Sequence, residues 1–414
     1  MPLQKILFKP GINRENTRYT TEGGWYDGNQ IRFRQGTPEV IGGWEYVSLN
    51  TYLGICRSLW TWDTLGGVTY TGVGTNLKFY VLDSGSYYDI TPIRSTVSLT
   101  GPFTATNGSA VITVHDVAHG ATDGSFVTFS GSTSLGGNIT AAVLDKEYQI
   151  TYVDDDNYTI TASVAANGSD TGHGGTVTAA YQVNAGPEVS VPITGWGVGG
   201  WGLGAWGVGL TDVDPMRIWS QTNWGQNLVF APNRGTIYYW DVATTTTARG
   251  VAINTGLGGT FTATNSSVSG VPTVLTFSSL VLGEGSRITV SGGSLPTGLT
   301  AGTYYVRNPN GNTCNVSSTA AGALISTTST GSGNVSNLPD VPVATNFIFV
   351  SDVYRFLMAF GSNPIEDTVQ DRMLVRWADQ ESLTDWYPDP NVNQAGFLRL
   401  SHGSETVSYT HLTL

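Results

Sequence analysis

Six carboxylates crowd one stretch near the end of this 414-residue chain, where a pair of them could hydrolyse a glycosidic bond. A glycosidase holds two carboxyl groups roughly 5–10 Å apart across a sugar-binding cleft. Spacing along a chain cannot establish that separation. We therefore interpret the stretch as acidic decoration of exposed loops and predict no catalytic residue. Its members are Glu366, Asp367, Asp371, Asp379, Glu381 and Asp385.

Two other groups have residue types that bind metals. His115 and His119 lie four residues apart, a spacing that places two imidazoles on one face of a helix. The following Gly120 and the strand-like alternation around them argue against a helix. Three aspartates at 154–156 suggest calcium, but a calcium loop needs alternating ligands, a glycine and a distal glutamate. We interpret them as a solvated hairpin turn and predict no metal site.

The remaining chemical motifs are absent. Cys56 and Cys314 have no CxxC or histidine-rich company, so we expect buried thiols rather than a disulfide framework or a zinc site. No P-loop, nucleophile elbow or dinucleotide fingerprint occurs, so we predict no cofactor and no enzyme. No apolar run approaches the ~20 residues of a membrane span, and the first residues lack the core of a signal peptide. We expect a soluble product folded in a cytoplasm.

Composition indicates an all-β protein. Charged residues make up only 12%, while the chain has 53 glycines, 19 tyrosines and 12 tryptophans. The formal net charge of −12 argues against a tight grip on nucleic acid, which needs clustered Lys and Arg. It is compatible with a surface that DNA passes without sticking.

The chain contains an internal repeat. Three stretches of one segment recur in the same order in a later segment, which predicts two copies of a small β-domain, module 1 (97–186) and module 2 (256–338). Within module 1 we expect Val111 and Thr113 on one face of a strand, and Tyr148, Ile150 and Tyr152 together on a face of another. The matched stretches begin at Gly101 and Gly259, at Ser125 and Ser286, and at Lys146 and Gly302.

Outside the modules, short aromatic strands broken by Gly or Asp turns predict a propeller-like body of short antiparallel blades. The modules interrupt this body as insertions. The expected organisation is a first part of the body at 1–96, module 1, a Gly/Trp connector and blade at 187–255, module 2, and further blades at 339–405. The last residues, 406–414, end in SYTHLTL, which resembles a translated sequencing adapter; we expect a non-native tail on a chain whose natural form continues.

A glycine-rich stretch at 195–209 places Trp196, Trp201 and Trp206 at five-residue intervals. This spacing fits neither the helical period nor the strand period. It suits a series of tight turns, each anchored by a tryptophan peg. Low-complexity disorder is the alternative, but disordered linkers are usually poor in tryptophan. Tryptophans elsewhere could stack on sugars, but at strand positions they normally fill the core.

Several stretches resemble the packaged-DNA stabilisation proteins, the tail hub or nozzle components, of short-tailed (P22-like) phages. The resemblance implies a hexameric ring with a propeller-like body, located in the virion tail below the portal and its adaptor and assembled in the host cytoplasm. It also implies a channel through which DNA passes without sequence-specific binding and which helps retain the genome until ejection. The stretches are Phe8–Glu45, the Gly/Trp stretch, Arg217–Asp241 and Arg372–Glu405.

For such a protein we expect structural or interface residues rather than catalytic ones, with arginines stacking on strand aromatics and pairing with carboxylates. We place the modules on the tail exterior, where they can touch a host surface glycan. Two alternatives stay open: a carbohydrate-binding or receptor-contacting tail protein acting through the modules, and a glycan-degrading propeller enzyme. The expected residues are Trp25, Arg32, Arg34, Trp44, Trp196, Trp201, Trp206, Trp219, Trp224, Trp240, Arg376, Trp377, Asp379 and Trp386.

Overall fold

The computed structural model confirms the all-β class. The described part of the chain is built from antiparallel strands and one single-turn helix, α1 (Ala141–Leu144). It divides into two units, Met1–Thr51 and Tyr52–Leu414. The structure describes residues 8–15, 17–20, 22–43, 45–189, 216–253, 258–264, 271–278, 282, 285–319, 322–337, 340–351, 353–365, 367–388 and 393–403.

The N-terminal unit contains one hairpin, formed by β1 (Ile31–Arg34) and β2 (Thr37–Val40). Both residues of its two-residue turn, Gln35 and Gly36, have positive φ, at 51° and 83°. This turn geometry matches the twist of the two strands. None of the described residues in this unit is fully buried.

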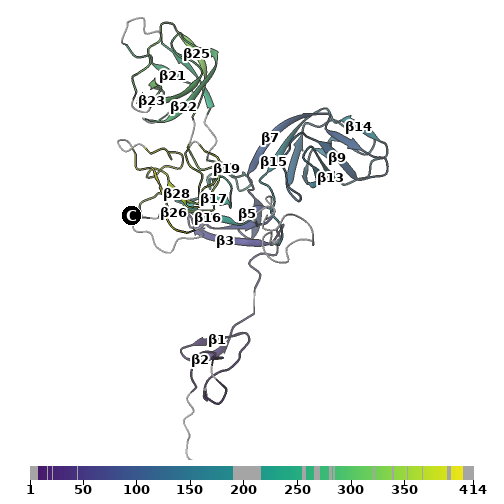
Figure 1. Ribbon diagram of the computed structural model, residues 1–414. Helices are drawn as coiled ribbons and strands as arrows, with labels where there is room; N and C mark the ends of the chain where they lie inside the picture. Colours follow the sequence, from purple (N-terminus) through teal and green to yellow (C-terminus); the bar gives the residue numbers. More distant parts are fainter. Residues whose placement is uncertain are drawn as a thin grey trace, which may run out of the picture. The chain divides into compact units, whose positions relative to one another are not determined.

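Three four-stranded sheets, here called the first, second and third body sheets, make up the body. In each, every strand pairs with the next strand along the chain. The first strand of the second sheet, β16, lies beside the first strands of both other sheets, β3 and β26. The strands are β3 (Cys56–Asp63), β4 (Thr69–Thr75), β5 (Phe79–Asp83) and β6 (Ser86–Asp89); β16 (Trp219–Trp224), β17 (Asn227–Pro232), β18 (Tyr238–Trp240) and β19 (Val251–Ala252); β26 (Phe347–Val350), β27 (Leu357–Phe360), β28 (Leu374–Trp377) and β29 (Gly396–Arg399) (Figure 1).

The second body sheet is packed on both faces, which explains the uninterrupted apolar run in β17. Leu228 and Phe230 point into the core shared with the first sheet, where Phe230 stacks on Phe79 with ring centroids 4.2 Å apart. Val229 and Ala231 point into the core shared with the third sheet. The expected antiparallel blades thus correspond to three stacked sheets, and the described residues form no closed propeller.

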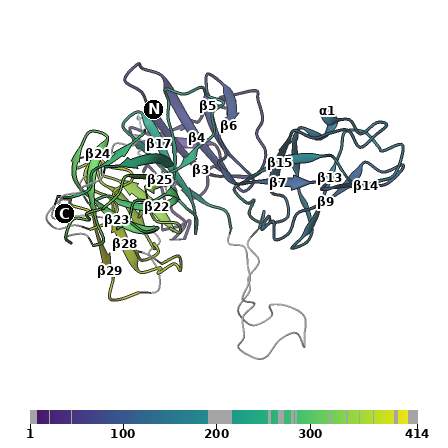
Figure 2. The same cartoon turned by 90° about the horizontal axis from the view of Figure 1, so that it is seen from above.

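Module 1 folds as two sheets over one core. Their strand orders are β11-β10-β15-β7 and β12-β13-β9-β8-β14. The hairpin turn expected at the three aspartates lies between β12 and β13, as predicted. The strands are β7 (Ile93–Thr100), β8 (Phe103–Ala105), β9 (Val111–His115), β10 (Phe126–Ser130), β11 (Glu147–Gln149), β12 (Thr151–Asp154), β13 (Asn157–Thr161), β14 (Asp170–His173) and β15 (Thr176–Gln182) (Figures 1 and 2).

Module 2 is a closed six-stranded barrel with the order β20-β21-β24-β23-β22-β25. Module 1 has the same cyclic order once β11 with β12, and β14 with β15, are each taken as one strand that passes between its two sheets. The second of these breaks falls at Gly174 and Gly175, both with positive φ. The barrel strands are β20 (Gly258–Ala263), β21 (Leu275–Phe277), β22 (Arg287–Ser294), β23 (Gly302–Asn310), β24 (Thr313–Ser317) and β25 (Gly331–Asn337).

The predicted alternation of module 1 is confirmed in β9, where Val111 and Thr113 share one face, and is met only in part by the second group of residues. In β9, Ile112 and Val114 are fully buried, while Val111 is 46% exposed, so the opposite face of the strand packs on the core. Tyr148 and Ile150 are buried as expected, but Tyr152 is 42% exposed, because β12 is the edge strand of its sheet.

Candidate functional site

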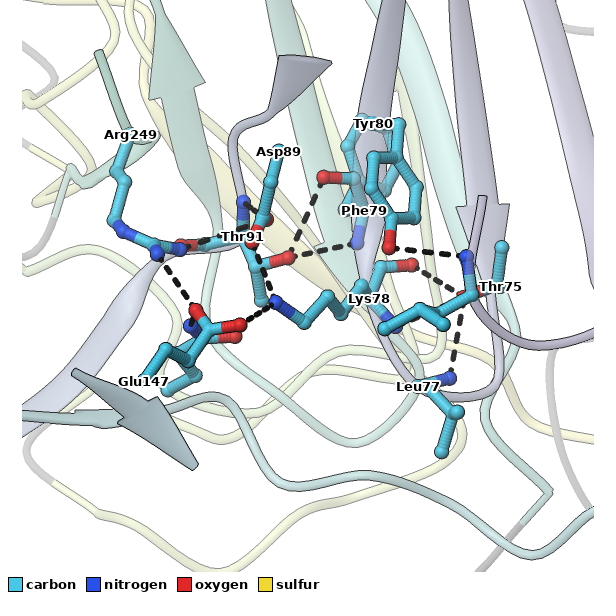
Figure 3. A network of polar contacts seen from close by, with 11 residues as sticks. Thr75, Leu77, Lys78, Phe79, Tyr80, Asp89, Thr91, Glu147 and Arg249 are labelled. Atoms are coloured by element: carbon cyan, nitrogen blue, oxygen red, sulfur yellow. Dashed lines mark hydrogen bonds and ion pairs between the residues drawn. The ribbon is translucent and has the colours of Figure 1, made fainter. Parts of the chain in front are cut away.

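Four charged side chains form a network that joins module 1 to the body (Figure 3). The ammonium of Lys78 lies 2.7 Å from the carboxylate of Asp89 and also contacts Glu147. Arg249 completes the group, with guanidinium nitrogens 3.5 Å from Asp89 and 3.2 Å from Glu147. Lys78 and Asp89 belong to the first body sheet, Glu147 to module 1 and Arg249 to the segment before β19. The network therefore connects three segments that are far apart in the sequence.

The turn between β4 and β5 positions Lys78. The hydroxyl of Thr75 accepts hydrogen bonds from the N–H groups of Leu77 and Lys78, at 3.2 and 2.9 Å, and donates to the Lys78 carbonyl at 2.8 Å. Such side-chain-to-backbone bonds close a tight turn. Thr91 holds the start of β5 in the same way, accepting from the N–H of Phe79 at 2.9 Å. The turn thus directs the lysine toward the two carboxylates (Figure 3).

Burial makes this network energetically important. The Lys78 side chain is only 4% exposed, and a buried ammonium persists only beside opposite charges. Burial raises the pKa of Asp89, but the Lys78 and Arg249 cations together lower it by more, so the pKa lies below its ordinary value. The ring of Phe126, from module 1, lies 4.3 Å from the Lys78 ammonium. The four formal charges balance, and the arrangement can hold module 1 in place.

Module 2 is also attached to the body by a cation and an aromatic ring, but here the cation belongs to the module and the ring to the body. Arg287, at the start of the barrel strand β22, forms an ion pair with Asp340 at 2.6 Å, and both side chains are 11% exposed. Its guanidinium lies 5.6 Å from the ring centroid of Tyr387, in the body. Tyr305 of the barrel also meets that ring edge-on, at 6.2 Å. Here the module supplies the cation and the body supplies the ring.

Two of the predicted residues, Arg376 and Trp386, are buried. Arg376 lies in β28 of the third body sheet, and Trp386 packs close to it. Arg376 is 1% exposed and donates to the carbonyls of Asn363, at 3.2 Å, and Asp340. Its guanidinium lies 5.9 Å from the ring of Trp386, whose indole N–H donates to the Leu383 carbonyl at 2.8 Å. Burial lowers the pKa of Arg376 to about 10. An arginine therefore lies beside an aromatic ring here, inside the core, but Trp386 belongs to the loop between β28 and β29 and not to a strand.

Three further predicted tryptophans lie in the second body sheet. Trp219 and Trp240 are almost fully buried in the core shared with the first sheet, and the indole of Trp219 donates to the Thr75 carbonyl at 2.8 Å. Trp224 is half-buried on the other face and lies under the guanidinium of Arg355 at 5.4 Å. All three pack between sheets, as expected of strand aromatics.

Trp377 and Asp379 hold the connection from β28 to β29. The Trp377 indole donates to the Gln394 carbonyl at 2.8 Å, and Asp379 accepts from the Gln394 N–H at 2.8 Å. A Cβ at Gly396 would lie 2.4 Å from the Trp377 ring, so only glycine allows β29 to approach this side chain.

The N-terminal candidates belong to the N-terminal unit. Trp25 lies between the rings of Phe8 and Phe33, at 5.7 and 6.3 Å. Arg32 forms an exposed ion pair with Glu39 at 2.5 Å, and Arg34 is exposed on the same face of β1. The other four candidates lie outside the described residues: Trp44, Trp196, Trp201 and Trp206.

The two histidines considered for metal binding have separate roles. His115 contacts the side-chain oxygen of Asn157 at 3.1 Å on the exposed end of β9. His119 is buried; its Nδ1 accepts from the N–H of Ala121 at 3.0 Å, so Nε2 carries the proton and donates to the Asp154 carbonyl at 2.9 Å. Within the described ranges, no three metal-ligating side chains lie together.

The acidic stretch is dispersed by the fold. Asp371 forms an ion pair with Arg399 at 2.6 Å; the Met373 N–H and this arginine lower the pKa of Asp371. Burial raises the pKa of Asp385, which accepts from the amide of Asn393. Glu366 lies outside the described residues. A cavity of about 570 Å³ beside Asp371 and Arg399 is lined mainly by apolar side chains, namely Pro364, Ile365, Leu374, Tyr387, Pro388 and Phe397.

Sequence reasoning missed the residues of both attachments. The available signal was Lys78 in TNLKFYVL, a lysine placed directly before an apolar strand. Such a cation is either exposed at the turn or buried with partners. Its carboxylate partners lie 11 and 69 positions later, and the larger separation is beyond any local pattern.

Comparisons with known proteins do not assign the chain to a family. No family model matches the sequence, and no curated protein matches it. Among solved structures, phage phi92 endosialidase superposes with a TM-score of 0.20 and 13% identity, covering 87% of this chain and 60% of that one. The chain thus spans less than two thirds of that protein. Within the described ranges, no helix has the length and apolar character needed to span a bilayer.

Proposed function

We propose that this chain is a structural virion protein of the tail hub or nozzle of a short-tailed phage. In this proposal it forms a ring, extends the DNA channel below the portal and adaptor, and helps retain the packaged genome until ejection. The observation that carries the proposal is the stack of three four-stranded sheets with β3, β16 and β26 side by side. Consecutive propeller blades have this arrangement, with their first strands nearest the axis. The proposal therefore includes a propeller-like body.

Two further observations support a role without catalysis. The net charge of −12 suits a channel wall that does not bind phosphate. The predicted residues of the body, such as Arg376 and Trp386, are occupied in packing and backbone hydrogen bonds. In this proposal the protein acts through shape and charge.

Ring formation is the direct test. The purified full chain, mixed with the portal-adaptor protein, is expected to give rings by negative-stain electron microscopy. Virions assembled without this protein are expected to lose DNase-resistant genome after packaging. Full genome retention in such virions would overturn the proposal.

A second candidate, contact with a host surface glycan, is favoured by the edge of module 1. All four residues of β12 are exposed, and Tyr152 offers a ring beside three aspartates. A glycan array should then detect binding by the full chain that Tyr152→Ala removes. Binding that persists in the variant would reject this edge as the contact.

A further inference from the structure

The described residues of the N-terminal unit (Met1–Thr51) form strands, but none of these residues is fully buried in a core. The one sheet within this described part is the β1–β2 hairpin. The cluster of Phe8, Trp25 and Phe33 leaves each of these residues partly or largely exposed. A two-stranded hairpin is marginally stable alone, and a unit this small can bury little apolar surface. The stability of this unit must therefore come from surface that it covers on something else.

Large apolar side chains on this unit face solvent. Tyr19 is 94% exposed, Leu49 is 92% exposed and Tyr46 is 84% exposed. Exposed large apolar side chains that lie together on a surface are typical of sites that contact a partner. Tyrosine and arginine are also the residue types enriched at the centres of protein interfaces. The exposed side chains of the unit thus have the composition of an interface.

Charge identifies the partner. The N-terminal unit has six Lys and Arg against five Asp and Glu, a net charge of +1, whereas residues 52–414 have 13 against 26, a net charge of −13. Two cations of the unit form no ion pair among the described residues. Arg18 lies over the Tyr26 ring at 4.5 Å and acts on Asp27 only at longer range, and Arg34 stands opposite Thr37 in the hairpin. A second copy of this chain offers the acidic surface that these arginines require.

We propose that the N-terminal unit is an assembly arm that folds against the acidic Tyr52–Leu414 unit of a second copy, with Arg18 and Arg34 pairing with carboxylates there. The inference deepens the proposed ring assembly and rests on it. It specifies which segment makes the contact between copies and predicts that salt weakens the association.

Zero-length crosslinking of a mixed sample tests the contact. Full chains made with natural and with ¹⁵N isotopes are combined and treated with carbodiimide, which joins lysine amines to carboxylates. We expect crosslinks from Lys9 of one isotopic form to carboxylates within residues 52–414 of the other. Lys9 crosslinks confined to chains of one isotopic form would show that the arm folds on its own chain and would overturn the inference.

Light scattering with charge-reversal variants completes the test. The double variant Arg18→Glu/Arg34→Glu should weaken self-association by about tenfold or more, because each reversed charge faces carboxylates. Arg18→Lys/Arg34→Lys and the exposed control Lys146→Glu should retain it. Undiminished association of the double variant would overturn the inference about the N-terminal unit but leave the proposed ring function standing. If the wild-type chain stays monomeric, or associates only when adaptor protein is added, both the inference about the N-terminal unit and ring formation by the isolated chain would be overturned.

Discussion

The two modules share a repeated sequence and a strand order, yet they are fixed to the body in opposite ways. Their aligned stretches place Phe126 of module 1 opposite Arg287 of module 2. The ring of Phe126 lies against the buried ammonium of Lys78, which belongs to the body. The guanidinium of Arg287 lies over the ring of Tyr387, which also belongs to the body. A carboxylate completes each site. The same position of the repeat thus contributes to both attachments, with an aromatic residue in module 1 and a cation in module 2.

The same comparison separates strand order from barrel closure. Module 2 closes with β23 and β25 uninterrupted, whereas module 1 has each corresponding strand broken in two. At one break, consecutive glycines at 174 and 175 adopt backbone angles that a regular strand does not allow. Strand order is therefore common to the repeat, and a few local breaks decide whether the sheet closes.

Loss of a matched core aromatic should have the largest effect. Phe103 and Phe261 occupy the same place in the FTAT motif of each module and are 0% and 1% exposed. Phe103→Ala and Phe261→Ala should each cost about 3–5 kcal/mol in the free energy of unfolding of their own module. Hydrogen exchange should rise in that module alone, with exposed Val117→Ala as the control. Simultaneous opening of both modules would show that they are not independent cores.

Removal of the buried lysine should come next. Lys78→Met leaves Asp89 and Glu147 with Arg249 alone, and we expect a loss of about 2–3 kcal/mol in urea unfolding, less than for a fully buried pair because both carboxylates are partly exposed. Hydrogen exchange should increase around β11 and leave module 2 unchanged. Exposed Lys146→Met is the matched control.

The counterpart substitution sharpens the comparison. Arg287→Met should loosen the barrel at β22 and leave module 1 protected. If either substitution loosened both modules equally, the two attachments would not be separate.

Acid should affect the module 1 attachment through Asp89. Because the folded-state pKa of this carboxyl lies below its ordinary value, its ionised form stabilises the folded state at pH above about 4. That contribution is lost as the pH falls below 4 toward the folded-state pKa. The wild type should therefore lose more stability than Asp89→Asn between pH 7 and 3.5, measured by urea unfolding. Equal losses would contradict a stabilising role for the charged form.

The smallest effect should come from a hydrogen bond that both modules make. Tyr148 donates to the Val143 carbonyl, and Tyr304 donates to the Thr300 carbonyl at 2.8 Å. Tyr148→Phe and Tyr304→Phe should each cost about 1 kcal/mol in thermal or urea unfolding. A much larger loss in one module would indicate that the two hydroxyls are not equivalent.

Sequence reasoning recognised the strand period but not always the buried face. In β9, both alternating sets contain branched side chains, so the period did not indicate which set is buried, and the core contains Ile112 and Val114. A strand with one polar set would have indicated its buried face. The body tryptophans were easier, because a large ring at a strand position is nearly always packed against a neighbouring sheet, as Trp219 and Trp240 are.

The sequence by itself determined the all-β class, the alternation of strands and turns, and the burial of body tryptophans such as Trp219 and Trp240, because these depend on residue type and short-range periodicity. Only the tertiary structure decided how the modules attach. Lys78 meets Glu147 across 69 positions, Arg249 meets Glu147 across 102, and Arg287 meets Tyr387 across 100. Ion pairs and cation–π contacts between distant segments leave no periodic trace in a chain. They become favourable only when the fold has removed the charges from water.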